Sequence, residues 1–189
     1  MLAEPRSRLR PDWRALLLLA RLKERNAESI FSAVADELEK NGVTLLPATT
    51  FLEDLLAPKG LIAGTKLSRR EEADVEFGCK IAKRIASLNI GQTIVVRNGT
   101  VLAVEAFEGT NETIRRAGAL ANGKSVVIKV AKPNQDMRFD VPVLGLETIR
   151  VAEIARIRVI ALEAGRTLLL EKEAMIAAAG RAGISLFGR

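Results

Sequence analysis

The chain from residue 68 onward alternates short apolar runs with amphipathic segments, a pattern typical of a sheet covered by helices. Apolar residues at intervals of three and four predict helices over residues 69–88, 110–120, 146–156 and 172–182. Runs rich in branched apolar residues predict strands over residues 93–97, 100–106, 125–130, 159–164, 167–170 and 184–187. Interleaved helices and strands indicate the α/β class, with a mixed β-sheet and flanking helices in a domain spanning residues 68–189.

Local signals predict how several of these elements begin and connect. Ser68 and Glu71 have the spacing of a capping box at the start of the first helix. Asn98-Gly99 separates two strand-like runs, which predicts a tight β-hairpin. A turn at residues 165–166 is expected to connect the strands 159–164 and 167–170.

The first 60 residues predict a mainly helical region. Helices are expected over residues 13–23, capped by Asp12, and over 27–40, ended by Asn41-Gly42. A short strand at 43–46 and a short helix at 50–56 follow. Because residues 58–70 lack an apolar pattern, we expect a connector there between a domain of residues 1–60 and one of residues 68–189.

The composition excludes several kinds of catalytic and metal-binding site. The 189 residues include no His and one Cys, so His-based catalysis, an intrachain disulfide and a Cys-cluster zinc site are excluded for this chain alone. The net charge of +6 favours an anionic partner, while the scarcity of aromatic residues argues against nucleic-acid binding by base stacking. The single Cys79 fits a reducing cytosol, where we expect the protein. No apolar run near the start is long enough to span a membrane. Any catalysis must then rest on carboxylates, Lys, Arg and a hard metal ion.

A polar loop, residues 131–142, follows the apolar strand that ends near Val130. Pro133 and Pro142 restrict its backbone, and we call it the Pro-braced loop. Loops that leave a buried strand often carry functional groups, although a solvated loop with ion pairs would have a similar composition. Asp140 lies between two apolar neighbours, so we expect it to be partly buried and therefore paired or metal-bound. Asp136 and Asp140, with Glu105 or Glu108, are candidate oxygen ligands for Mg²⁺. The alternative is that Asp140 forms a structural ion pair with Arg138 or Lys132.

A second candidate site is the turn that leads from a strand into the helix at residue 110. Thr110 is expected to cap this helix, whose free N–H groups and dipole would favour a phosphate. Arg115 and Arg116 would add positive charge one turn further on. The alternative is a well-capped helix with a solvated face.

Short motifs in a characteristic order carry a family resemblance. They are Asn89-Ile90-Gly91-Gln92, Val101–Glu105, Glu108–Thr110, Ala131–Pro133 and Asp140–Pro142. In this order they resemble the C-terminal domain of the UDP-2,3-diacylglucosamine pyrophosphatases of lipid A biosynthesis, of the LpxI type. The resemblance covers roughly residues 68–189, and residues 10–57 are similar to the last helices of that family's N-terminal domain.

The resemblance implies a phosphohydrolase that uses Mg²⁺ or Mn²⁺. Its substrate, the nucleotide-linked glycolipid UDP-2,3-diacylglucosamine, would be cleaved to UMP and 2,3-diacylglucosamine 1-phosphate. The family's essential aspartate falls on Asp140, which we take as the catalytic residue and as a metal ligand together with Glu105. The expected substrate- and phosphate-binding residues are Thr110, Arg115, Lys132, Gln135 and Arg138.

The chain also departs from the family pattern. It has Asn111 where Asp is usual, and the Gly-rich opening strand and turn of the N-terminal domain are absent. We therefore expect a truncated chain with impaired activity, whose exposed apolar helix faces favour a homo-oligomer. The resemblance implies no nucleic-acid partner and allows peripheral contact with the inner membrane. The competing interpretations are a non-catalytic binding or dimerisation domain and, in a third class, a basic nucleic-acid binder.

Overall fold

The computed structural model describes residues 12–22, 27–121 and 123–189. It separates into two compact units, Met1–Pro47 and Ala48–Arg189. Of the helices in the described residues, none combines the length and the apolar character needed to cross a membrane.

The smaller unit contains α1 (Trp13–Arg21) and α2 (Ala27–Lys40). The expected cap is confirmed, because the Asp12 carboxylate accepts a hydrogen bond from the Ala15 N–H at 2.8 Å. The predicted end of α1 at residue 23 lies outside the described residues. Gly42, with φ of +79°, ends α2 as expected. The strand predicted at 43–46 is wrong: the segment is irregular, and the described part of this unit offers no strand with which it could pair.

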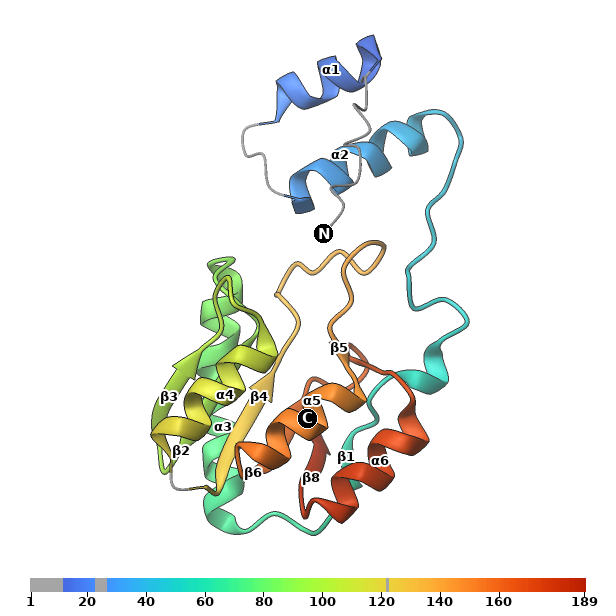
Figure 1. The fold of residues 1–189 in the computed structure, drawn as a ribbon. Helices are drawn as coiled ribbons and strands as arrows, with labels where there is room; N and C mark the ends of the chain where they lie inside the picture. The colour runs from blue at the N-terminus through green and yellow to red at the C-terminus, as the bar shows by residue number, and fades with distance from the viewer. Residues whose placement is uncertain (1–11, 23–26, 122) are drawn as a thin grey trace, which may run out of the picture. The chain divides into compact units, whose positions relative to one another are not determined.

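The larger unit is an α/β domain, as predicted, built on a mixed six-stranded sheet (Figure 1). Its strands, in spatial order, are β1 (Gly60–Ala63), β8 (Ser185–Gly188), β6 (Ile157–Leu162), β4 (Ser125–Lys129), β2 (Thr93–Arg97) and β3 (Thr100–Val104). The strands β4, β6 and β8 are parallel, whereas β1, β2 and β3 pair antiparallel with their neighbours.

Helices cover both faces of this sheet. On one face lies α3 (Arg69–Ser87), and on the other lie α4 (Thr110–Leu120), α5 (Leu146–Ile154) and α6 (Lys172–Arg181) (Figure 1). Each face has its own apolar core, and β4, between them, is buried at all five positions. Strands buried on both faces read as continuous apolar runs, which is why β4 and β6 were recognisable in the sequence.

Two of the local signals are confirmed in atomic detail. The Ser68 hydroxyl accepts the Glu71 N–H at 3.3 Å, and the Glu71 carboxylate accepts the Ser68 N–H at 2.7 Å. At the hairpin, Asn98 and Gly99 both have positive φ, +53° and +70°. Their N–H groups donate to the buried Asp74 carboxylate at 2.8 and 2.7 Å, so α3 holds the hairpin turn in place.

Residues 48–70 differ from the prediction. The expected connector contains β1, which pairs with β8 at the edge of the sheet. The helix predicted at 50–56 is a single 3₁₀ turn, Glu53–Leu55, and the Ala57 N–H donates to the Thr167 carbonyl at 2.8 Å. Residues 48–57 thus belong with the larger unit.

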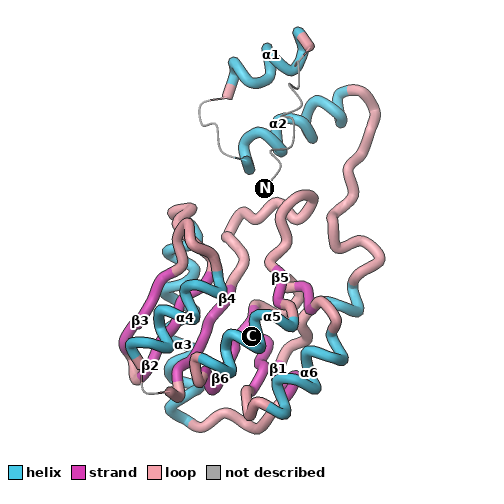
Figure 2. Tube along the Cα trace, viewed as in Figure 1, coloured by secondary structure: helices cyan, strands magenta, loops and turns pink. Residues whose placement is uncertain are grey.

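A second small sheet also differs from the prediction. The strand expected over 167–170 is β7 (Leu168–Leu169), which pairs in parallel with β5 (Val143–Leu144) rather than with β6. Two-residue strands carry no readable pattern in a sequence. Figure 2 shows the long loop that leads from β4 into β5 and that carries the Pro-braced motif.

Candidate functional site

Three segments that are distant in the sequence meet at one end of the sheet. Thr93 at the start of β2 pairs with Lys129 at the end of β4, and the Glu105 N–H donates to the Thr93 carbonyl at 2.9 Å. This register brings together the loop before β2, the turn after β3 and the loop after β4. The motifs of the sequence therefore converge on one place.

Lys129 lies at the centre of this end of the sheet and was not among the predicted site residues. Its side chain is buried, with 8% of the residue exposed, and its ammonium donates to the Thr110 hydroxyl at 2.8 Å. Burial lowers the pKa of Lys129, and the neighbouring carboxylates of Glu105 and Asp140 oppose this shift. A lysine that ends an otherwise apolar strand was the available signal, since a buried charge requires partners.

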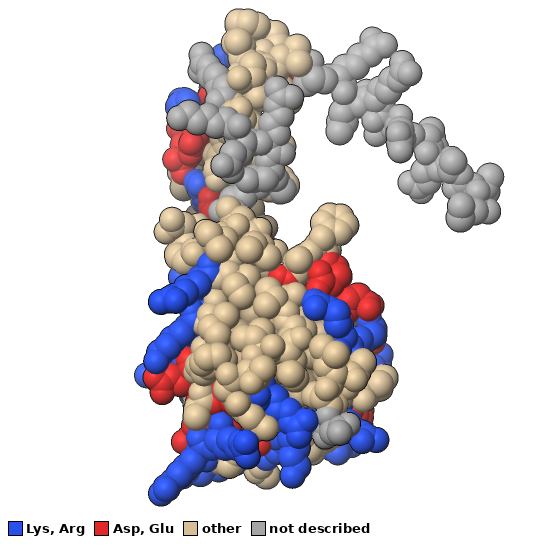
Figure 3. Space-filling model, turned by 90° about the vertical axis from the view of Figure 1, so that its left-hand side faces the viewer, with Lys and Arg blue, Asp and Glu red and all other residues tan. Residues whose placement is uncertain are grey.

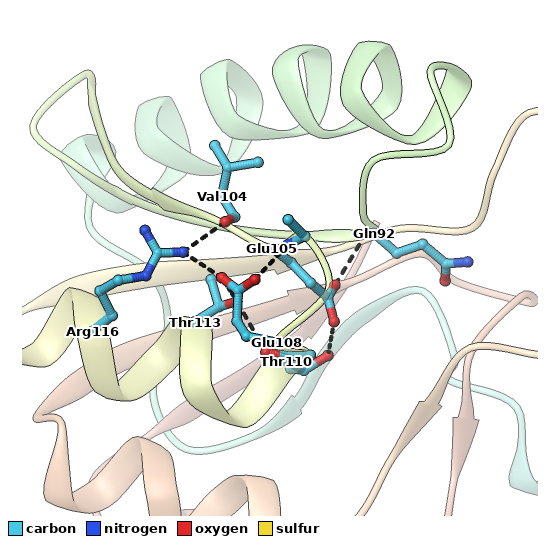
Figure 4. Close-up of polar contacts among 9 residues, drawn as sticks. Gln92, Val104, Glu105, Glu108, Thr110, Thr113 and Arg116 are labelled. Atoms are coloured by element: carbon cyan, nitrogen blue, oxygen red, sulfur yellow. Dashed lines mark hydrogen bonds and ion pairs between the residues drawn. The ribbon is translucent and has the colours of Figure 1, made fainter.

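Thr110 links the Lys129 ammonium to Glu105. The Thr110 hydroxyl donates to Glu105 Oε1 at 2.9 Å and lies 3.1 Å from the Thr93 hydroxyl. Thr110 is therefore not the helix cap that the sequence predicted; Gly109, with φ of +85°, holds that position. The other Glu105 oxygen accepts the Gln92 N–H at 3.1 Å, so this carboxylate bridges Gln92 and Thr110 (Figure 4).

Gln135 extends the network to the Pro-braced loop. Its carbonyl oxygen accepts the Lys132 N–H at 2.9 Å and the Gln92 side-chain amide at 3.2 Å. Its own amide donates to the Asp140 carboxylate at 2.7 Å and to the Asp140 carbonyl at 2.9 Å. A continuous chain of hydrogen bonds thus runs from Lys129 to Asp140 through Thr110, Glu105, Gln92 and Gln135.

Asp140 itself is exposed, so the expectation that it is partly buried is wrong. The chain leaves the sheet after β4, and the carboxylate is held at the surface by Gln135. The loop forms an ion pair between Arg138 and Asp136, with an N–O distance of 2.8 Å. The hydrogen bond from Arg138 holds the pKa of Asp136 below its usual range.

The two arginines expected to bind phosphate or to add positive charge on α4 form ion pairs with nearby glutamates. Arg115 pairs with Glu112, while Arg116 pairs with Glu108 and donates to the Val104 carbonyl at 2.8 Å (Figure 4). Of the two glutamates proposed as ligands, Glu105 lies in the network and Glu108 is ion-paired. Asn111 lies on the first turn of α4 and takes no part in the network; its side-chain oxygen is buried with no hydrogen-bond partner among the described residues.

A cavity of about 250 Å³ lies beside the network. Two cations, Lys129 and Lys132, line it together with the Glu105 carboxylate. The rest of the lining comes from Asn89, Ile90, Gly91, Gln92 and Ala106. Two lysines around a small polar cavity suit a phosphate-bearing ligand, because each supplies a charged donor to phosphate oxygens.

The carboxylates of the network are also candidate ligands for a metal ion. Within the described residues, no group of three His, Cys, Asp or Glu side chains is placed to hold a metal ion. Mg²⁺ commonly needs only one or two carboxylates, with substrate phosphates and water as its other ligands. Asp140 is exposed, and each Glu105 oxygen accepts one hydrogen bond, from the Gln92 N–H or the Thr110 hydroxyl, and keeps a lone pair. Asp140 and Glu105 are therefore the carboxylates of the network with oxygen lone pairs left for a hard cation.

Positive charge also gathers away from this site. Arg70, Arg97, Lys124 and Arg158 line a cavity of about 480 Å³ beside the hairpin, at the opposite end of the sheet. Figure 3 shows Lys and Arg side chains gathered at the lower end of one face. The net charge of the chain is therefore not concentrated at the candidate site, whose own cations are Lys129 and Lys132.

Gly91 allows the loop before β2 to approach Glu105, which gives a prediction. A Cβ at this position would lie 2.1 Å from the Glu105 carbonyl oxygen. We expect Gly91→Ala to displace the Glu105 backbone and to lower the free energy of unfolding by about 1–3 kcal/mol. Urea denaturation measures this change. Gly180→Ala is the matched control, because its Cβ meets no atom within 4 Å and its helix should gain about 0.5–1 kcal/mol. Equal effects of the two substitutions would contradict the close approach.

Comparisons with known proteins show the family to which this chain is similar. Residues 58–187 match the family model of the LpxI C-terminal domain, and residues 3–55 match that of the LpxI N-terminal domain. The chain is 35% identical over 193 residues to the UDP-2,3-diacylglucosamine pyrophosphatase LpxI of Caulobacter vibrioides, covering 96% of this chain and 69% of that protein. These matches give no support to the expectation of a truncated chain. All the residues of the network lie within the C-terminal match, and the chain belongs to the LpxI family.

Proposed function

We propose that this protein hydrolyses the diphosphate of UDP-2,3-diacylglucosamine, releasing UMP and 2,3-diacylglucosamine 1-phosphate in lipid A biosynthesis. The proposal is supported by the name of the Caulobacter relative, a UDP-2,3-diacylglucosamine pyrophosphatase. The observation that carries it is the continuous hydrogen-bond chain from the buried Lys129 to the exposed Asp140, beside a cavity lined by two lysines.

The lysines would bind the diphosphate. Because Lys129 is desolvated, its attraction for an anion is stronger than it would be in water. Thr110 and Glu105 hold the ammonium in a fixed position, so little reorganisation is needed as charge develops on the phosphate oxygens. Lys132 would supply a second cation from the loop.

Asp140 would act at the reacting phosphorus. Gln135 orients its carboxylate and leaves the group open to water and substrate. In that position it could accept a proton from the attacking water or hold a metal ion. Asp140 and Glu105 would hold Mg²⁺ or Mn²⁺, and the ion would polarise the phosphoryl group as a Lewis acid.

The proposed substrate also suggests where the protein acts. Its two acyl chains reside in a membrane, so we infer a protein of the cytosol that contacts the inner membrane peripherally. Exposed apolar side chains on α1 and α2, including Trp13, Leu16, Phe31 and Val34, support association into a homo-oligomer. Light scattering of the purified protein tests the oligomeric state.

A direct assay tests the proposed function. The purified chain is incubated with UDP-2,3-diacylglucosamine in detergent micelles, with Mg²⁺, with Mn²⁺ and with a chelator, and UMP is quantified by chromatography. We expect UMP in the two metal samples and little in the chelated sample. Substrate binding without UMP release would favour the non-catalytic alternative. The rate relative to that of the Caulobacter relative measures whether activity is reduced, as the sequence predicted.

Lys132 is expected to contribute to binding of the substrate in its ground state. Lys132→Ala should raise KM for the diphosphate by about 10-fold with little change in kcat, since it removes one cation from the cavity. Arg138→Ala should raise KM as well, and it should also destabilise the loop by removing the partner of Asp136. Steady-state kinetics separate KM from kcat. Arg97→Ala, which removes a cation at the opposite end of the sheet, is the control, and an equal rise in KM there would refute a specific role for Lys132.

A further inference from the structure

We infer that Lys83 and Glu163 are positioning residues for the reaction, because together they fix the point at which the loop of the candidate site leaves the sheet. This inference rests on the proposed function. Lys83 lies on α3 and Glu163 directly follows β6, so neither belongs to a motif that the sequence identified. Neither side chain lines the cavity of the candidate site.

The two side chains bind the backbone N–H and carbonyl of one residue, Ala131. Glu163 Oε2 accepts the Ala131 N–H at 2.8 Å, and the Lys83 ammonium donates to the Ala131 carbonyl at 2.9 Å. The ammonium and the carboxylate are themselves 2.6 Å apart. A single ion pair thus satisfies both backbone polar groups of a residue that is fully buried.

The location explains why such a pair is needed. β4 ends at Lys129. Two backbone hydrogen bonds continue its pairing, from the Val130 N–H to the Gln92 carbonyl and from the Glu163 N–H to the Lys129 carbonyl. At Ala131 the backbone pairs with no strand among the described residues. A buried N–H or carbonyl without a partner is costly, so the chain can turn away from the sheet here only because side chains replace the missing strand.

The captured residue lies between the proposed functional groups. Ala131 follows Lys129 by two positions and precedes Lys132, whose N–H donates to the Gln135 side chain that holds Asp140. The orientation of the Ala131 backbone therefore determines the direction of Lys132 and the position of Gln135. A shift of about 1 Å in catalytic groups can lower a rate by about 100-fold, so a contact outside the cavity can control the reaction.

The experiment compares three variants with one matched control. Lys83→Met and Glu163→Gln each break the pair, and Lys83→Arg keeps its charge. Lys80→Met makes the same chemical change one turn earlier on α3, where Lys80 pairs with Glu76 at 3.0 Å on the surface. We measure kcat and KM for UDP-2,3-diacylglucosamine, Tm, and amide hydrogen exchange of the peptide covering residues 130–142.

We expect Lys83→Met and Glu163→Gln to lower kcat by about 10- to 100-fold and to accelerate exchange in residues 130–142. KM should change little. Tm should fall by a few degrees, because Ala131 is fully buried and its backbone loses a hydrogen-bond partner. Lys83→Arg should restore most of kcat, and the double variant should be no worse than either single one, because both act through Ala131. Lys80→Met should resemble the wild type in every measurement.

Two outcomes would overturn the inference: unchanged exchange and kcat in Lys83→Met, or equal losses of kcat and Tm in Lys83→Met and Lys80→Met. The exchange measurement does not depend on turnover. If the wild-type protein releases no UMP, the proposed function fails, and the exchange result alone decides whether the pair positions the loop.

Discussion

Asp140→Asn is expected to lower the rate of UMP release by about 10²- to 10⁴-fold, the range typical for loss of a general base. The substitution removes the negative charge and keeps an oxygen that can accept the hydrogen bond from Gln135. Because Asp140 is exposed, the fold should be preserved and Tm should change little. Initial rates at saturating substrate and thermal melting measure the two quantities.

Asp136→Asn is the matched control for this prediction. It makes the same chemical change four residues earlier in the same loop, at a carboxylate that pairs with Arg138. We expect a modest loss of stability and a rate within about 10-fold of the wild type. Full activity of Asp140→Asn, or an equally large loss in Asp136→Asn, would remove Asp140 from the role of base or metal ligand.

Lys129→Met is expected to lower kcat by about 10²- to 10³-fold, comparable to removing one donor that stabilises developing charge. Met has a similar length but carries no charge, so Thr110 and Glu105 keep their mutual hydrogen bond while the cation is lost. The result is read from kcat and from the binding of UMP, which should weaken. An active Lys129→Met variant would show that the buried ammonium has a structural role.

Lys129 also gives a prediction for the pH dependence of stability. Burial lowers the pKa of Lys129 in the fold below its usual value of 10.5. Between the lowered pKa and 10.5 the unfolded chain binds more protons than the folded chain, so this group makes stability rise with pH. Lys129→Met lacks this contribution. Urea denaturation at pH 7 and pH 10 should therefore show the wild type gaining stability relative to the variant, while Lys80→Met, at an exposed lysine, should follow the wild type.

Much of the fold was predictable because its signals are local. The helix at 110–120, the capping box of Ser68 and Glu71 and the hairpin at Asn98-Gly99 all form as predicted. Each depends on residues that are close in the sequence, through helical periodicity, capping hydrogen bonds or the positive φ of a turn. The α/β class follows from the order of these elements.

The candidate site was predictable in part. The resemblance located the segments that converge at the start of β2 and the ends of β3 and β4. Thr110, Glu105, Gln135 and Asp140 do lie in one network. The contacts between segments were not predictable, because only the register of the sheet brings Lys129 to Thr110 and Gln92 to Glu105 and Gln135. The exposure of Asp140 was likewise decided by the path of its loop after β4.

Local signals in the sequence were therefore enough to predict the α-helices of the larger unit, the hairpin, the family resemblance and the segments that carry the chemistry. Only the tertiary structure decided that β1 pairs with β8, that β5 pairs with β7, and that Lys129 is the buried cation of the site. The physical reason is that strand pairing and the burial of a charge depend on partners far away in the chain. The backbone of Ala131 shows this most directly, since its N–H and carbonyl bind side chains 32 positions after it and 48 positions before it.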